Sequence, residues 1–255
     1  METGPRPEDG TELRVVGRLV EASNATFLVQ FEGPDGLVDA VYKPVAGEAP
    51  LWDFPSGTLA LREVAAFELS RAVGFDVVPD TFLIDGGPYG AGSLQLWVDH
   101  DDTTLVDVLP ETEVPYGWFA VMEGVDGDEQ PVLLVHADDE RLRRLALFDA
   151  LTNNADRKGG HVIVHGERVY GVDHGVCFHH EPKLRTVLWG WAGEPVREDE
   201  RALVLAAIEQ GPDTLAGYLA DAEIEAFVDR CYAVLQAGEL PLPGVGWPAI
   251  PWPPF

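Results

Sequence analysis

The stretch of residues 147–178 constrains the fold of this chain more than any other part of the sequence. It reads as the end of a helix, a polar loop carrying Asp156, and two short apolar runs separated by Gly166. The second run leads directly into Asp173, and Gly175 follows two residues later. Short apolar runs on either side of a glycine predict a β-hairpin, so one acid is expected before the hairpin and one after it.

A helix, an acid in a loop, a hairpin and a second acid close to a glycine form a layout typical of phosphoryl-transfer sites. In that layout the first acid lies near the hydroxyl that accepts the phosphoryl group. The second acid holds magnesium against the nucleotide phosphates. The sequence therefore predicts Asp156 near an acceptor and Asp173 at a metal ion.

Composition excludes several other classes of protein. A chain of 255 residues can form one two-lobed domain or two small domains, and no apolar run approaches the roughly 20 residues of a membrane span. The formal net charge of -27 should repel nucleic acid and anionic membrane surfaces. The polar, acidic N-terminus does not resemble a secretory signal. We expect Cys177 and Cys231 to be buried thiols in a reducing compartment, hence a cytoplasmic protein.

The first third of the chain predicts a β-rich region with a phosphate-binding lysine. From residue 13 the sequence alternates in strand fashion, and residues 21–26 form a small, polar connection whose backbone amides could approach phosphates. A plain hairpin turn is the alternative for that connection. Lys43 ends the third run and is one of only three lysines in the chain. A solvated edge lysine is the alternative to a phosphate-binding role.

A helix is predicted over residues 59–73, ending at Gly74. Glu63 lies on a face of small and apolar side chains, where an unpaired carboxylate would be costly. Lys43 is its natural partner, and Glu68 is the second choice for that pairing. Two more strands follow, and Gln95 to Val98 should connect the first lobe to the second.

The second half is predicted to be mostly helical. Residues 100–130 are acidic and rich in turn formers, so we expect an insertion or mobile flap with a helical fragment at 103–109. Helices are then predicted from residue 138 and over 198–210, 214–219 and 222–236. The last sixteen residues hold six prolines and two tryptophans, which excludes regular structure. Trp247 and Trp252 should pack this tail along the body, with binding of a protein partner as the alternative.

Several motifs, in collinear order over residues 13–180, resemble the phosphatidylinositol 3- and 4-kinase superfamily. The likeness is closest to the type II 4-kinases and to a group of uncharacterised bacterial kinase-like proteins. The motifs are VYKP at 41–44, REVAAF at 62–67, VPDT at 78–81, GSLQL at 92–96, NADR at 154–157 and VDHG at 172–175.

The resemblance implies an α+β, two-lobed protein-kinase-like fold, with a β-rich N-lobe containing one helix and a mostly helical C-lobe. The divisions expected are a disordered N-terminus (1–12), an N-lobe (13–98), a C-lobe (99–239) and a Pro/Trp-rich tail (240–255).

The same resemblance implies the roles of individual residues. Lys43 would bind the phosphates of ATP and Glu63 would hold Lys43. Asp156 would act on the acceptor hydroxyl, and Asp173 would bind Mg²⁺ or Mn²⁺. The residues expected to contact the nucleotide are Ser23, Asn24 and Thr26 in the loop, and Gln95, Leu96, Trp97 and Val98 at the adenine.

One position departs from the family pattern. The family usually places Asn five residues after the catalytic Asp as a second metal ligand, whereas this chain has His161. Imidazole suits manganese better than magnesium. Either His161 is a substitute ligand, or the site is degraded, or Asn153 or Asn154 supplies the ligand. Gly159 and Gly160 also replace bulkier residues and should open the loop.

The expected function is ATP-dependent phosphate transfer to a hydroxyl of a protein or a soluble small molecule, because the acidic surface disfavours a membrane lipid. AMP transfer stays an alternative. A nucleotide-binding regulator without turnover is the alternative from another class, and a structural module that uses the tail is the third.

Overall fold

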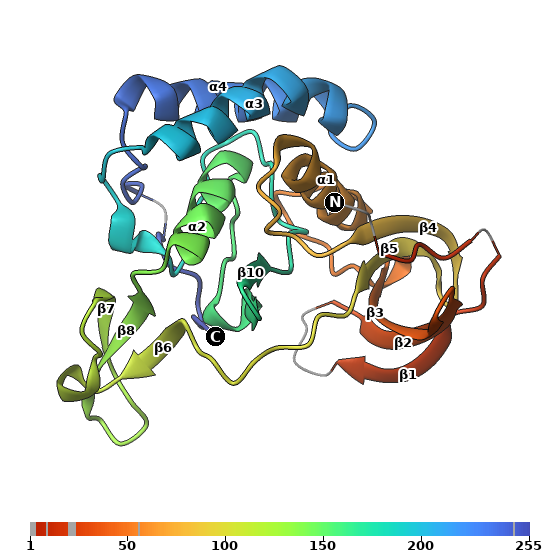
Figure 1. Ribbon diagram of the computed structural model, residues 1–255, viewed down its shortest axis with the longest axis horizontal. Coiled ribbons are helices and arrows are strands. Elements are labelled where there is room, and N and C mark those ends of the chain that lie inside the picture. Colours follow the sequence, from red (N-terminus) through yellow and green to blue (C-terminus); the bar gives the residue numbers. More distant parts are fainter. Residues whose placement is uncertain (1–3, 9, 20–23, 56, 247) are drawn as a thin grey trace.

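The first sheet is built by the N-terminal part of the chain. The computed structural model describes residues 4–8, 10–19, 24–55, 57–246 and 248–255. Five antiparallel strands are arranged in the order β1-β2-β3-β5-β4 (Figure 1). They are β1 (Arg14–Leu19), β2 (Thr26–Gly33), β3 (Gly36–Pro44), β4 (Thr81–Gly87) and β5 (Gly90–Leu96). The predicted strands of this region are confirmed, since alternating β-branched and aromatic residues favour a sheet with one buried face.

The helix α1 (Leu59–Val73) matches its prediction and ends at Gly74, whose φ of 88° needs a residue without Cβ. It contacts both the first sheet and the C-terminal helix α3 (Glu198–Leu215). Its side chains Ala65, Phe67 and Leu69 belong to the larger hydrophobic core, together with residues of the C-terminal half. The first sheet has a smaller core of its own around Val29 and Tyr42. The helix therefore joins the sheet to the rest of the molecule.

Residues 100–130 do not contain the predicted helical fragment. They contribute β6 (Val106–Leu109) and β7 (Trp118–Val125), which pair on either side of β8 (Pro131–Ala137) in a three-stranded antiparallel sheet. No helix forms over residues 103–109. Buried Val106, Leu134 and Val135 line the sheet, so long-range pairing overrides the local abundance of turn formers.

The helix α2 (Glu140–Thr152) and the hairpin β9 (Val162–His165) with β10 (Arg168–Gly171) frame the candidate catalytic loop. Asp139 caps α2 by accepting the amides of Arg141 and Leu142. The helix ends at Asn153, which adopts a left-handed conformation with φ 56°. The predicted helix, loop and hairpin are confirmed, and the loop between them lies over a buried helix end.

Two long helices complete the fold, α3 and α4 (Asp221–Ala237), which pack against each other (Figure 1). The predicted separate helix over residues 214–219 is wrong, because α3 continues through Pro212 to Leu215. Gly211 gives it close access to Phe227 of α4. In the described part of the chain, short 3-10 helices lie at Val45–Gly47, Glu111–Glu113, Gly159–His161 and Trp189–Trp191.

The tail beyond residue 239 has no helix or strand among its described residues. Trp247 lies outside the described part, and Trp252 is 77% exposed, so the prediction that Trp252 packs the tail is wrong. Ile250 packs against the main core instead. No helix in the described ranges is long and apolar enough to cross a membrane. The molecule is thus a mixed α/β protein whose described part has three antiparallel sheets and four α-helices.

Candidate active site

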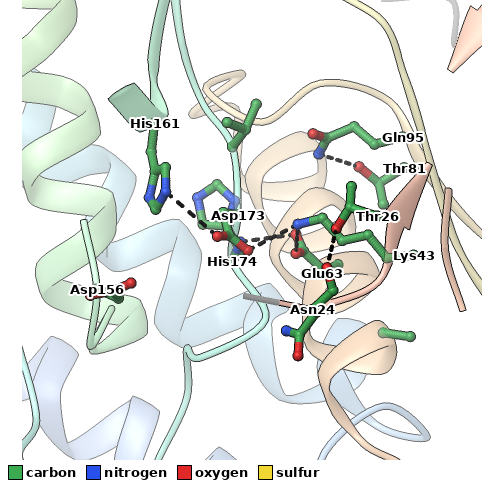
Figure 2. A network of polar contacts seen from close by, with 12 residues as sticks. Asn24, Thr26, Lys43, Glu63, Thr81, Gln95, Asp156, His161, Asp173 and His174 are labelled. Carbon is green, nitrogen blue, oxygen red and sulfur yellow. Dashed lines mark hydrogen bonds and ion pairs between the residues drawn. The ribbon is translucent and has the colours of Figure 1, made fainter. Parts of the chain in front are cut away.

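Three charged side chains from three separate elements meet in Figure 2. The ammonium of Lys43, at the end of β3, lies 2.5 Å from Glu63 Oε1 on α1 and 2.9 Å from Asp173 Oδ1 after β10. Glu63 is buried, whereas the side chain of Asp173 is 47% exposed. The predicted contact between Lys43 and Glu63 is therefore present. Glu68, the second choice, pairs instead with Arg71 at 3.1 Å.

Glu63 also fixes the backbone that follows β10. Its second oxygen, Oε2, accepts the amide of His174 at 2.9 Å. Asp173 has a φ of 61°, a conformation uncommon for a residue with a side chain. One buried carboxylate therefore orients both the lysine and the turn that presents Asp173. Such strained residues concentrate at functional sites, where surrounding contacts hold them.

The charges in this triad reinforce one another. Burial alone would lower the pKa of Lys43, but the carboxylates of Asp173 and Glu63 raise it above its usual value. The Lys43 ammonium in turn holds the pKa of Asp173 far below its usual range. Burial raises the pKa of Glu63, and Lys43 opposes that shift. Lys43 is therefore a cation and Asp173 an anion at neutral pH, as phosphate and metal binding would require.

A buried arginine organises the loop that carries Asp156. Arg157 donates to both carboxylate oxygens of Asp149 in α2, through Nε at 2.7 Å and Nη2 at 2.9 Å. Its Nη1 donates to the carbonyls of Val172 at 2.7 Å and His161 at 3.2 Å. Its Nη2 also lies 2.8 Å from His174 Nε2. Because arginine can only donate, His174 accepts at Nε2 and carries its proton on Nδ1.

Asp156 lies beside two cations that the sequence analysis missed. Lys158 Nζ is 3.4 Å from Asp156 Oδ2, and Arg185 Nη2 is 3.6 Å from Oδ1. Burial raises the pKa of Asp156, Lys158 lowers it, and Asp173 raises it, with a net rise. A carboxylate whose pKa is raised by burial and by a second acid suits proton transfer. Lys158 could have been found from the scarcity of lysine, but nothing in the sequence marks Arg185.

His161 projects towards Asp173 in Figure 2, with its Nε2 3.5 Å from Asp173 Oδ2. Burial lowers the pKa of His161 to about 4, so the imidazole is neutral and can act as a ligand. Its buried Nδ1 has no hydrogen-bond partner in the described part of the chain. In a metal-bound histidine, the other ring nitrogen usually donates to a carboxylate or carbonyl that fixes the ring orientation. No such partner of His161 Nδ1 is present among the described residues.

Asn153 and Asn154 are poorly suited as alternative metal ligands. Both are buried, and each side-chain oxygen already accepts a backbone amide. Asn153 Oδ1 accepts Lys183 N at 2.8 Å, and Asn154 Oδ1 accepts Asp156 N at 2.9 Å. These contacts shape the loop, and of the predicted ligands they leave His161 and Asp173 as candidates for a metal ion.

The possible metal ligands fit a metal ion that binds as a complex with a nucleotide. Within the described ranges, no group of three or more His, Cys, Asp or Glu residues could hold a metal by itself. Magnesium at nucleotide sites commonly takes one or two protein carboxylates and completes its shell with phosphates and water. The half-exposed carboxylate of Asp173 meets that requirement, with His161 beside it.

The predicted nucleotide loop is described in part. Ser23 lies outside the described residues. Asn24 Oδ1 accepts the amide of Ala49 at 2.7 Å, and Thr26 Oγ1 donates to the carbonyl of Asn24 at 3.3 Å. Both side chains lie near Lys43 in Figure 2. Their hydrogen bonds shape the loop locally, and their contact with a nucleotide stays a prediction.

The predicted connector, residues 95–98, begins inside β5, because Gln95 and Leu96 belong to that strand. The side chain of Gln95 is buried and donates to Thr81 Oγ1 at 2.9 Å. Leu96, Trp97 and Val98 line a cavity of about 480 Å³. Neither Lys43 nor any of the predicted catalytic acids lines that cavity. Contact of these connector residues with adenine stays a prediction.

Comparison with known proteins places the chain in a family. Protein Rv2133c of Mycobacterium tuberculosis is 48% identical over 261 residues, covering 96% of this chain and 92% of the relative. The chain therefore belongs to the family of Protein Rv2133c. No protein-family model matches the chain.

A solved structure, that of the Helicobacter pylori proinflammatory kinase CtkA, is similar over 91% of this chain and 93% of its own. Its sequence identity is 12% and its TM-score 0.43. A TM-score that low establishes neither a shared fold nor a shared activity. The resemblance to phosphatidylinositol kinases likewise stays a prediction.

Proposed function

We propose that this protein is an ATP-dependent phosphotransferase with a two-lobed, kinase-like arrangement of its site. The observation that carries the proposal is the Lys43 ammonium held between Glu63 and Asp173. These residues come from a strand, a helix and a post-hairpin turn, far apart in the sequence. Lysine, glutamate and aspartate in such an arrangement are the parts that phosphoryl transfer requires.

The side chains divide the reaction between them. Lys43 binds phosphate oxygens while Glu63 keeps the ammonium oriented. A magnesium or manganese ion, held by Asp173 and His161, would neutralise charge on the β- and γ-phosphates. Asp156 accepts the proton of the acceptor hydroxyl while the oxygen of that hydroxyl forms a bond to the γ-phosphorus. The bond from that phosphorus to the β–γ bridging oxygen breaks, and ADP leaves.

The acceptor is proposed to be a hydroxyl of a protein or a soluble small molecule. The net charge of -27 opposes approach to an anionic lipid surface. Lys158 and Arg185 concentrate positive charge beside Asp156, and an acceptor with a nearby anionic group would benefit from it.

A nucleotide-binding regulator without turnover is the second candidate. It is favoured by His161 at the position where the resembled family has Asn, and by the direct contact of Lys43 with Asp173. An entering metal ion must compete with that contact. Transfer of AMP instead of phosphate is the third outcome that an assay must separate.

The test is incubation with ATP labelled at the γ- or the α-phosphate, with Mg²⁺ or Mn²⁺, and with Asp173→Asn as control. We expect the γ-label, and not the α-label, to be transferred to the acceptor. This transfer should be faster with Mn²⁺ than with Mg²⁺ and absent in the control. Transfer of the α-label would assign AMP transfer. Nucleotide binding without transfer of either label would assign the regulator.

A further inference from the structure

The tail contacts the candidate catalytic loop directly. The amide of Gly159 donates to the carbonyl of Pro254 at 2.8 Å. A Cβ placed on Gly159 would lie 2.8 Å from Cδ1 of Phe255 and closer still to Cε1 and Cζ. Gly159 is buried beneath that ring and stands three residues after Asp156. The expectation that the two glycines open the loop is therefore wrong at Gly159, where the ring of Phe255 fills the space.

A second set of hydrogen bonds connects the same tail to the same loop through an intervening strip, residues 185–189. The amide of Arg157 donates to the carbonyl of Arg185 at 3.0 Å, and the amide of Val187 donates to the carbonyl of Arg157 at 3.1 Å. On the other side of this strip, Thr186 N and Trp189 Nε1 both donate to the carbonyl of Ala249, at 3.0 and 2.9 Å. The loop is thus held by the strip and by the tail at once.

The two neighbouring glycines provide an internal comparison. Neither has a left-handed φ, so an alanine could adopt either backbone conformation. A Cβ on Gly160 meets none of the described residues within 4 Å, whereas a Cβ on Gly159 collides with Phe255. The requirement for glycine at position 159 therefore comes from the tail and not from the loop itself.

We infer that the segment Pro254 and Phe255 is a positioning element of the active site, which holds the loop that carries Asp156 and His161. This inference rests on the proposed phosphotransferase function. Phe255 does not touch the reacting atoms; it acts through Gly159. Phe255 as a residue is 47% exposed, so it fixes the loop from outside the main core. Displacement of a reacting group by about 1 Å can cost about a hundredfold in rate.

The test combines Gly159→Ala, Gly160→Ala, Phe255→Ala and the double variant Gly159→Ala/Phe255→Ala. We measure kcat and KM for ATP, and hydrogen exchange of the Gly159 amide. Gly159→Ala should lower kcat by about tenfold or more. Gly160→Ala should retain the wild-type kcat. The double variant should recover to about the level of Phe255→Ala, because the new methyl group then has room.

Hydrogen exchange separates failure of this inference from failure of the proposed function. In Phe255→Ala the Gly159 amide should exchange faster, while the core amides of α2 exchange as in the wild type. If the wild type transfers phosphate and Gly159→Ala matches Gly160→Ala, the inference is wrong and the function stands. If the wild type transfers nothing, the function fails. Whether or not phosphate is transferred, unchanged exchange of the Gly159 amide in Phe255→Ala would show that the tail does not hold the loop.

Discussion

The two halves of the candidate site are held in different ways. On the phosphate side, Lys43 and Asp173 are fixed by charge, through contacts of 2.5 and 2.9 Å around one ammonium. On the acceptor side, the loop of Asp156 is fixed by the fully buried ion pair of Arg157 with Asp149 and by backbone hydrogen bonds. Removing one partner of the fully buried pair leaves an uncompensated charge in the core, whereas the half-exposed carboxylate of Asp173 can be neutralised at a smaller cost to the fold. The halves should therefore respond differently to mutation.

The largest effect is expected from Arg157→Met, which leaves the buried carboxylate of Asp149 without its charged partner and with the hydrogen bond from Asn154 Nδ2. Breaking a buried pair on one side costs about 3–5 kcal/mol of the free energy of unfolding. Arg185→Met is the matched control, since its 3.6 Å contact with Asp156 is partly exposed and should contribute at most about 1 kcal/mol. Urea denaturation of both variants measures the difference, and equal losses would remove Arg157 as the loop's main support.

The dependence of stability on pH should reveal the buried, neutral His161. Its folded pKa of about 4 lies below the value near 6.5 of the unfolded chain. Between these values the unfolded state binds more protons, so stability decreases as the pH falls, by up to about 3 kcal/mol from this residue. His161→Asn should reduce the proton uptake on unfolding by about one in this window. An unchanged slope of unfolding free energy against pH would place His161 in contact with water.

Nucleotide binding should stabilise the fold through the phosphate side alone. ATP with Mn²⁺ at 100 times its dissociation constant should add about 2.7 kcal/mol, because the unfolded chain lacks the site. Lys43→Met should abolish this increase, whereas Arg185→Met should keep it. The melting temperature with and without nucleotide is the measurement. No shift in the wild type with either metal would contradict both nucleotide-binding hypotheses.

The smallest effect is expected far from both halves, at the start of α2. Asp139 accepts two backbone amides there, and Arg141 together with these bonds lowers the pKa of Asp139. Asp139→Ala should cost about 1 kcal/mol of unfolding free energy and leave the rate of phosphate transfer unchanged. A lower rate of phosphate transfer in the folded variant would show that the position of α2 affects the loop of Asp156.

The difference between the halves also explains what could be predicted from the sequence. Lys43 ends a predicted strand, and Glu63 lies on a helix face of small and apolar side chains. Both are local patterns. Their contact could be predicted because the Glu63 carboxylate needs a cation and the chain has only three lysines. Arg157 carries no local sign that it is buried, because its partners lie in α2, the loop and the residues flanking Asp173.

Long-range pairing accounts for most of the fold that was missed. The strands β6, β7 and β8 are separated by acidic turns, so their hydrophobic pattern is weak until the three pair. Where α3 continues through Pro212, Gly211 packs closely against Phe227 of α4, a contact that the local sequence does not indicate. The contact of Phe255 with Gly159 joins residues far apart in the sequence, and no periodicity could indicate it.

The most direct test compares Asp156→Asn with Asp173→Asn in one titration of ATP·Mn²⁺, followed by measurement of γ-phosphate transfer. We predict that Asp156→Asn binds the nucleotide as tightly as the wild type and transfers phosphate about 10²–10⁴ times more slowly. We predict that Asp173→Asn loses metal-dependent binding altogether. If Asp156→Asn loses binding while Asp173→Asn keeps it, or if the wild type binds no nucleotide, the assignment of the two halves is wrong.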